Sequence, residues 1–312
     1  MKALGLDLMD VNRDGALDMI LFLDFGASRI LTQDAQGGFK PLAATSAVLD
    51  GLLSGTRPGL LKSVDLGAKE GGDSMLAIKD KFARATWIDK DQNVVVEEQF
   101  NGKDSTSRLV DAAVGSLRSA DSREVVLLDR PSKLLTVHGR ENGGAFTKLI
   151  DHPLDDASYS TVTLFDLDGD QRDDIILAAD DRLSVIYTQP QGLNLNTVSS
   201  HSTTIEDGGY GKVWGVNLPG PRATGIIAIE MSENYLDFLE VGKDADGNPA
   251  LNKFYGFKVF DSEATIARRV NMDGQPEPRE IVVSDLNDDG LADVVTLIHD
   301  NIIIYPGVQK AP

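Results

Sequence analysis

The chain has 312 residues with 49 acidic side chains, 30 basic side chains and no cysteine, which gives a formal net charge of −19. This charge argues against nucleic-acid binding, which needs basic patches, and against binding to anionic membrane surfaces. Without cysteine the chain forms no disulfide and no zinc–cysteine site. No apolar run approaches the roughly 18 residues of a transmembrane helix, so we expect no membrane insertion and no nucleic-acid partner.

The first informative segment, residues 10–18, carries oxygen-bearing side chains at alternating positions. Positions 1, 3, 5 and 9 of this nine-residue loop, together with the carbonyl oxygen of position 7, are supplied by Asp10, Asn12, Asp14, Asp18 and Ala16. Calcium takes six or more hard oxygen ligands in proteins, so this spacing predicts a calcium loop.

The same spacing recurs twice. The second copy uses the side chains of Asp166, Asp168, Asp170 and Asp174 with the carbonyl of Arg172, and the third uses Asp285, Asn287, Asp289 and Asp293 with the carbonyl of Leu291. Position 6 makes the sharp bend and is glycine in the first and third copies, but it is Gln171 in the second. Gln171 has to accept a positive φ, at roughly 1–2 kcal/mol, or turn differently. We expect calcium to bind there nevertheless, because all four side-chain ligands are Asp.

The surroundings of the loops distinguish them from EF-hands, which need a Glu at position 12 and a helix on each side. Apolar, β-branched runs follow each loop instead, at 17–22, 174–178 and 293–298. In this strand–loop–strand context the copies resemble FG-GAP (VCBS-type) repeats, the blades of integrin-like β-propellers. The resemblance implies a propeller fold, three structural calcium sites and an extracytoplasmic location, and it brings no catalytic residues.

Three further segments, 65–73, 116–124 and 217–225, match the loop in register but have broken ligand sets. In two of them a basic residue, Lys69 or Arg118, occupies a ligand position, where its charge could replace the ion; the alternative is decay into an ordinary hairpin. The six copies begin at residues 10, 65, 116, 166, 217 and 285. This period of about 50 residues is typical of a four-stranded propeller blade.

A second hairpin follows the loop in five of the six copies, and one of its predicted outer strands is 193–195. The sixth copy ends after its third strand, 302–305. We therefore predict an all-β fold, a single β-propeller domain over 1–312 with six four-stranded antiparallel blades, or seven if another blade lies in the 68-residue interval from 217 to 285. The predicted blades are 1–45, 60–102, 108–150, 158–200, 210–258 and 278–308.

Residues 206–214 form a predicted connection that is not one of the calcium loops. This connection is rich in glycine and contains Tyr210 and Trp214. Aromatic rings beside acidic groups can stack on a sugar, so these two residues mark a possible ligand face. The alternative is that Trp214 packs as a core residue of an inner strand. The four histidines (138, 152, 201 and 299) show no paired metal-ligand spacing, and no catalytic motif is present.

Together these features lead us to expect a calcium-stabilised β-propeller that is not an enzyme and acts as a protein–protein interaction or adhesion module. Its partner would be a protein or a cell-surface component. The alternatives are a lectin that binds a glycan, and a polysaccharide lyase, which would need a base and an anion-stabilising group. Weak calcium sites fill outside the cytosol, so we expect about three calcium ions and a periplasmic or extracellular protein. We find no signal peptide before the first strand and expect that it has been removed.

Overall fold

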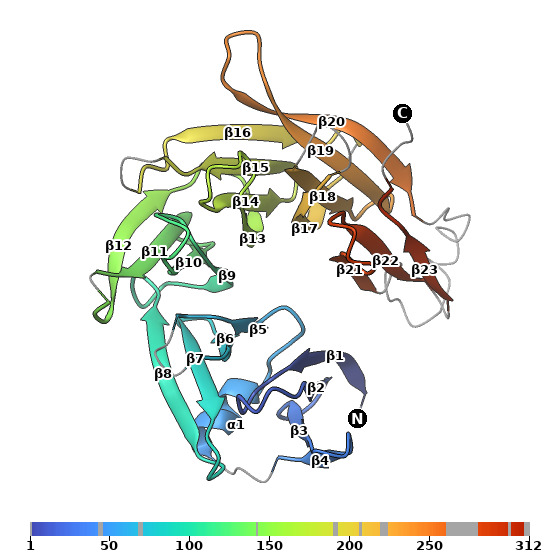
Figure 1. The fold of residues 1–312 in the computed structure, drawn as a ribbon. Coiled ribbons are helices and arrows are strands. Elements are labelled where there is room, and N and C mark those ends of the chain that lie inside the picture. The colour runs from blue at the N-terminus through green and yellow to red at the C-terminus, as the bar shows by residue number, and fades with distance from the viewer. Residues whose placement is uncertain are drawn as a thin grey trace. The chain divides into compact units, whose positions relative to one another are not determined.

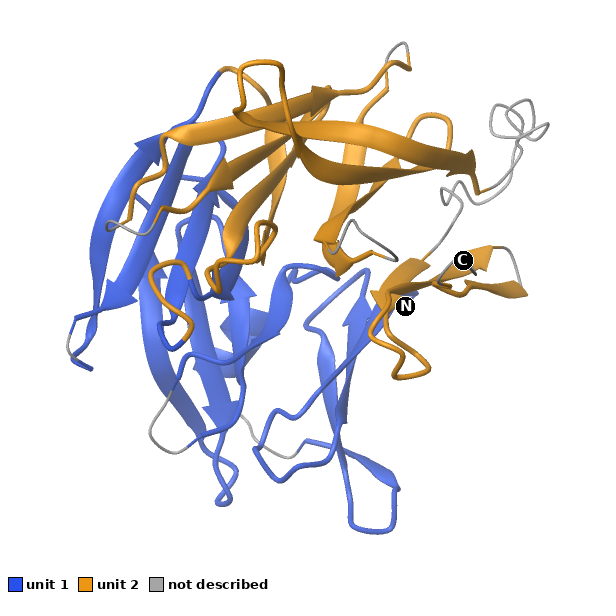
Figure 2. Ribbon diagram, turned by 45° about the horizontal axis from the view of Figure 1, so that its top comes forward, with its two compact units in different colours: residues 1–116, 121–155 blue, residues 117–120, 156–312 orange. Residues whose placement is uncertain are grey.

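A computed structural model gives the structure of residues 2–42, 46–67, 71–141, 143–189, 193–205, 208–218, 224–259, 280–298 and 301–308. The predicted fold class is confirmed: the chain is an all-β protein of six antiparallel sheets, the blades of a β-propeller (Figure 1). It divides into two compact units, 1–116 with 121–155 and 117–120 with 156–312, and each unit holds three sheets (Figure 2). No helix in the described ranges has the length and apolar character needed to cross a membrane.

The first unit contains three four-stranded sheets, in which strands that follow one another in the chain are hydrogen-bonded neighbours. The first blade consists of β1 (Ala3–Met9), β2 (Asp18–Leu23), β3 (Arg29–Gln33) and β4 (Phe39–Pro41). The second consists of β5 (Leu61–Val64), β6 (Ser74–Ile78), β7 (Phe82–Ile88) and β8 (Val94–Asn101). The third consists of β9 (Leu109–Gly115), β10 (Glu124–Asp129), β11 (Leu134–Arg140) and β12 (Phe146–Pro153).

The second unit repeats this arrangement in the fourth, fifth and sixth blades. The fourth blade consists of β13 (Tyr159–Phe165), β14 (Asp174–Ala179), β15 (Arg182–Tyr187) and β16 (Thr197–Ser202). The fifth consists of β17 (Tyr210–Asn217), β18 (Thr224–Glu230), β19 (Tyr235–Lys243) and β20 (Pro249–Lys258). The sixth consists of β21 (Glu280–Ser284), β22 (Asp293–Ile298) and β23 (Asn301–Tyr305).

The second strand of each blade is its most buried element. Every residue of β6, β10 and β14 is buried, since both faces of these strands are covered. Such strands read in sequence as continuous apolar runs rather than as alternating ones. This explains why the runs after the loops were predictable.

The sequence prediction missed one element, the helix α1 (Ala47–Leu53), which lies between the first two blades. Ser46 caps it, because the Ser46 side chain accepts a hydrogen bond from the backbone N–H of Val48. Leu49, Leu52 and Leu53 are buried in the same apolar cluster as strands of the first and second blades. The helical spacing of these leucines was a readable signal.

Two predictions about outer strands have different outcomes. The predicted strand 193–195 is wrong, because the outer strand of the fourth blade is β16, which pairs Thr197 with Tyr187. This edge strand is mostly polar, so its sequence carries little strand signal, whereas Leu195 is buried outside it. The sixth sheet has three strands in the described residues, as predicted. Residues 260–279, which belong to the interval 217–285 where we allowed a seventh blade, fall outside the described residues.

Candidate functional site

The three full loops connect the first and second strands of the first, fourth and sixth blades, and each folds around the carboxylate at its first position. Asp10 accepts the backbone N–H groups of positions 5 and 6, at 3.1 and 2.8 Å. Asp166 and Asp285 accept the equivalent N–H groups at 2.7–3.1 Å. The side chain at position 3 also accepts the N–H of position 5 in all three loops; these residues are Asn12, Asp168 and Asn287. The three loops therefore share one pattern of hydrogen bonds.

The question raised by Gln171 is answered by an exchange within the loop. Positions 4 and 6 both have positive φ in all three copies. In the first and third loops position 6 is glycine and position 4 is Arg13 or Asp288, whose φ is 59° in both. In the second loop Gly169 takes position 4 with φ 80°, and Gln171 accepts φ 68° at position 6. Each loop thus contains one glycine and one non-glycine residue in the left-handed region.

The aspartate at position 9 has a different role from the other ligand positions. Asp18, Asp174 and Asp293 are 0–2% exposed. In the fourth blade, Asp174 accepts the N–H of Leu167 at 3.1 Å and that of Thr188 at 3.0 Å. Asp18 and Asp293 make the equivalent pairs of bonds. The position-9 carboxylate therefore ties the start of the loop to the end of the third strand or to a residue just after it.

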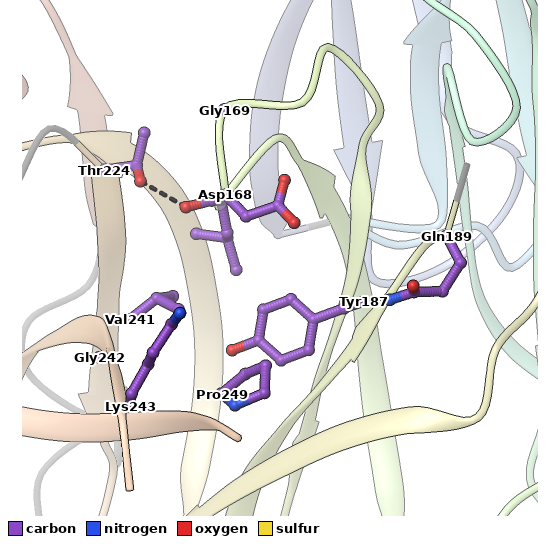
Figure 3. Close-up of a pocket in the computed structure, with 10 residues that line it drawn as sticks. Asp168, Gly169, Tyr187, Gln189, Thr224, Val241, Gly242, Lys243 and Pro249 are labelled. Atoms are coloured by element: carbon purple, nitrogen blue, oxygen red, sulfur yellow. Dashed lines mark hydrogen bonds between the residues drawn. The ribbon is translucent and has the colours of Figure 1, made fainter. Parts of the chain in front are cut away.

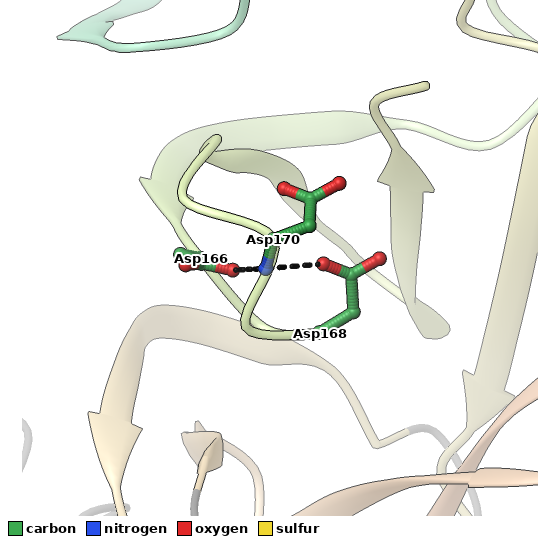
Figure 4. A group of neighbouring side chains, drawn as sticks. All are labelled: Asp166, Asp168 and Asp170. Carbon is green, nitrogen blue, oxygen red and sulfur yellow. Dashed lines mark hydrogen bonds between the residues drawn. The ribbon is translucent and has the colours of Figure 1, made fainter. Parts of the chain in front are cut away.

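The loop of the fourth blade gathers the densest group of acids. Ligand oxygens of Asp166, Asp168 and Asp170 lie within 4.8 Å of one another (Figure 4). Partial desolvation and the neighbouring Asp166 carboxylate raise the pKa of Asp168. Burial, followed by the neighbouring acids, raises the pKa of Asp174 to about 7. Converging hard oxygens that repel one another fit a divalent cation.

Arg172 partly offsets this charge from within the same loop. Its guanidinium is paired with the carboxylate of Asp170, and its side chain is 12% exposed. Positions 7 of the first and third loops are Ala16 and Leu291, which carry no charge. The predicted ligand positions hold three acidic residues in those loops and four in this one, so Arg172 offsets the additional acid of the fourth-blade loop.

Two arginines contact the broken loop of the second blade. Arg140 donates to the carbonyls of Leu66 and Gly67 at 2.9 and 3.1 Å, and the guanidinium of Arg123 lies 3.4 Å from the carboxylate of Asp65. A cation thus does occupy this loop, although the residue that we proposed for it, Lys69, lies outside the described residues.

A pocket of about 450 Å³ opens beside the fourth-blade loop, within the second unit (Figure 3). Its walls come from that loop, from the end of β15 and from the β19–β20 turn, and include Leu167, Asp168, Tyr187, Gln189, Val241, Lys243 and Pro249. The hydroxyl of Thr224 donates to the carbonyl of Leu167 at 2.6 Å and so joins the fifth blade to the loop. Asp168 belongs to both the acid cluster and the pocket.

The pocket combines an apolar surface with few polar groups. Burial raises the pKa of Tyr187 to about 12, so its hydroxyl, which is 2.9 Å from that of Ser199, stays neutral at pH 7. The charged groups are Asp168 and Lys243, and they lie on different sides of the Tyr187 ring in Figure 3. Sequence reasoning found Asp168 as a metal ligand but missed Lys243 and the pocket itself.

The predicted ligand face lies elsewhere, and its residues are largely enclosed. Tyr210 is 3% exposed, and its hydroxyl donates to Asp237 at 2.9 Å. Trp214 is partly buried and packs against a core cluster of the fifth and sixth blades, which is the alternative that we gave for it. A ligand face at these two residues stays a prediction, and their burial does not favour it.

Comparison with known proteins supports the fold. No protein-family model matches the sequence. No curated protein matches it either. Among solved structures, a protein from Lactobacillus plantarum matches with a TM-score of 0.53 at 12% identity, over 97% of this chain and 92% of that one. The periplasmic gluconolactonase of Pseudomonas aeruginosa matches with a TM-score of 0.50 at 16% identity, over 80% of this chain and 69% of that one.

The second of these structures contradicts our prediction of a non-enzymatic interaction or adhesion module, because that protein, whose fold is similar, is an enzyme. The prediction rested on the lack of a catalytic motif. That ground was weak, since a site assembled from several blades takes its residues from distant parts of the chain and leaves no contiguous motif.

Proposed function

We propose that the protein is a hydrolase of small cyclic esters, and that its site is the pocket beside the fourth-blade loop. The similarity to a gluconolactonase supports the reaction class, at the level of the fold. The observation that carries the proposal is that Asp168 belongs to both the acid cluster and a pocket of small-ligand size. One carboxylate therefore connects a candidate metal site with a candidate substrate site.

The reaction assigned to this pocket opens a lactone. The oxygen of a water molecule bonds to the carbonyl carbon, the ring C–O bond breaks, and the water's proton ends on the ring oxygen, which gives a hydroxy acid. Asp168 would orient that water, while the Tyr187 ring, Leu167 and Val241 would exclude other water from the site. Lys243 would attract negative charge at another wall.

We also propose calcium as the ion of the three loops, and the assignment to FG-GAP (VCBS-type) repeats belongs to this proposal. The repeated oxygen spacing and the shared loop hydrogen bonds support it. A divalent cation bound by Asp166, Asp168 and Asp170 would supply Lewis-acid polarisation of a carbonyl next to the pocket. A periplasmic location is consistent with calcium sites of this kind and with the location of the gluconolactonase.

The direct test is lactone hydrolysis by the purified protein, followed by acid release in a pH-stat. The substrates are the 1,5-lactone of gluconic acid and a lactone of glucaric acid, each with calcium and with EDTA. We expect hydrolysis above the spontaneous rate. Its absence for both lactones, with the protein folded and calcium present, would overturn the proposal.

The matched variants come from the loops themselves. Asp168→Asn places in the fourth-blade loop the residue that the other two loops have at position 3, Asn12 and Asn287, so the loop fold is retained. We expect kcat/KM to fall about 100-fold. The reciprocal variant Asn287→Asp, in a loop outside the described pocket, should leave the rate unchanged. Equal rates for wild type and Asp168→Asn would move the site elsewhere.

A further inference from the structure

Lys243 lies at the start of a turn whose geometry is repeated in other blades. Between β19 and β20, the Asp244 side chain accepts the N–H groups of Asp246 and Asn248, both at 2.9 Å. Between β7 and β8, Asp89 accepts the equivalent N–H groups of Asp91 and Asn93 at 2.9 and 2.8 Å. The turn after β3, built on Asp34, has the same bonds.

These copies show that the turn does not need a lysine. The residue just before the turn aspartate is Gln33 in the first blade and Ile88 in the second. In the fifth blade this residue is Lys243, whose exposed side chain makes no ion pair or hydrogen bond in the described part of the chain. Its side chain instead runs along a wall of the pocket, in view of the Tyr187 ring (Figure 3). Neither the turn nor the contacts of the Lys243 side chain therefore give this residue a structural role.

The other groups of the pocket restrict what Lys243 could meet. Asp168 offers acceptors for hydroxyl donors, and Gln189 offers an amide. The surface between them is mostly apolar. A ligand complementary to this set has an anionic group near Lys243 and hydroxyl groups along the rest of its length.

We infer that the pocket selects small polyhydroxylated acids, with the anionic group of the ligand against Lys243. Its substrates would then be lactones that keep a carboxylate or phosphate outside the ring. This inference rests on the proposed function only where it names a substrate, because selection of an acid can be measured without turnover.

The test is calorimetric binding of gluconate and of sorbitol, two six-carbon chains that differ in charge at one terminal carbon, at fixed free calcium. We expect gluconate to bind at least 10-fold more tightly than sorbitol. Glucarate and 6-phosphogluconate, measured in parallel, distinguish a carboxylate from a phosphate at the second anionic position. Equal binding of gluconate and sorbitol, or binding of neither, would overturn the inference.

Two variants assign the effect to Lys243. Lys243→Gln copies the first-blade turn and should weaken gluconate binding about 10- to 100-fold, with sorbitol unchanged. Lys90→Gln makes the same charge change within the second-blade turn, at a residue that does not line the pocket, and should bind like wild type. Equal losses in both variants would show a general charge effect and contradict the inference. If gluconate binds selectively but no lactone is hydrolysed, the inference holds and the proposed function fails.

Discussion

The loops of the second and fourth blades occupy the same place, between the first and second strands, but they balance charge in different ways. In the fourth blade the carboxylates of Asp166, Asp168 and Asp170 converge, and Arg172 offsets one of them. In the second blade the loop carbonyls instead receive the guanidinium of Arg140. A loop that turns its oxygens inward needs positive charge, and this protein supplies that charge from arginine in one blade and, in our proposal, from calcium in the other.

The first-blade loop shows a third arrangement, in which an arginine of the loop contacts the second blade. Arg13, at position 4, pairs with Glu97 at 2.8 Å, donates to the carbonyl of Asp73 at 3.0 Å, and lies 4.6 Å from the centre of the Trp87 ring. Glu97 and Trp87 both belong to the second blade. An acidic loop can thus also fasten its blade to the next one.

The three loops with complete sets of oxygen ligands should differ most from the second-blade loop in their response to a calcium chelator. Calcium at ~20 times its dissociation constant adds ~1.8 kcal/mol per site to the free energy of unfolding, so three sites add ~5 kcal/mol. We expect EDTA to lower the melting temperature by several degrees and metal analysis to find close to three calcium ions per chain. A melting temperature that does not respond to calcium would contradict the assignment of all three loops.

The next effect concerns the buried carboxylate of the fourth blade. Asp174→Ala leaves the backbone N–H groups of Leu167 and Thr188 without their acceptor. The free energy of unfolding should fall by about 2–4 kcal/mol, measured by chemical denaturation. Asp246→Ala removes a carboxylate from an exposed turn and should change it by less than about 0.5 kcal/mol. Similar losses in both variants would mean that Asp174 does not anchor the loop.

Arginine in the second-blade loop should contribute without any metal. Arg140→Ala removes two hydrogen bonds to loop carbonyls and a cation–π contact at 4.3 Å to Phe146. We expect a loss of about 1–3 kcal/mol that is the same in calcium and in EDTA. Arg140→Lys keeps the charge but not the planar fork, so it should restore only part of the stability. A loss that appears only in calcium would erase the distinction between the two kinds of loop.

A smaller effect should appear in the calcium affinity of the fourth-blade loop. Arg172→Gln removes the guanidinium that pairs with Asp170. Because the Asp170 carboxylate is then no longer shared with a guanidinium, we expect calcium to bind there roughly 2- to 5-fold more tightly, measured by titration calorimetry. Weaker binding would show instead that Arg172 organises the ligands.

The smallest effect concerns pH and should be independent of the loops. Burial lowers the pKa of His138. Below about pH 6.5 the imidazole is therefore protonated in the unfolded chain before it is protonated in the folded chain. The contribution of His138 is therefore present at pH 7 and is lost as the pH falls. His138→Gln should flatten the decline of stability between pH 7 and pH 5, equally with calcium and with EDTA. A slope unchanged by the substitution would assign that decline to other groups.

The blades and the loops could be predicted from the sequence, because both depend on local spacing. Oxygen ligands at alternating positions and an apolar run after position 9 are formed by neighbours in the chain, so the strands β2, β14 and β22 could be read directly. The mostly polar edge strand β16 could not, because only its pairing with β15 makes it a strand.

The pairing of charged groups could not be predicted and became evident from the folded chain. Arg13 and Glu97 are 84 positions apart, and Arg140 and Leu66 are 74 apart, so no local pattern connects them. The pocket likewise brings Asp168 of one blade together with Lys243 of the next. The burial of Tyr210 against Asp237 could not be predicted from the sequence either. Side-chain contacts between blades depend on how whole sheets pack, and packing is a property of the assembled core rather than of spacing along the chain.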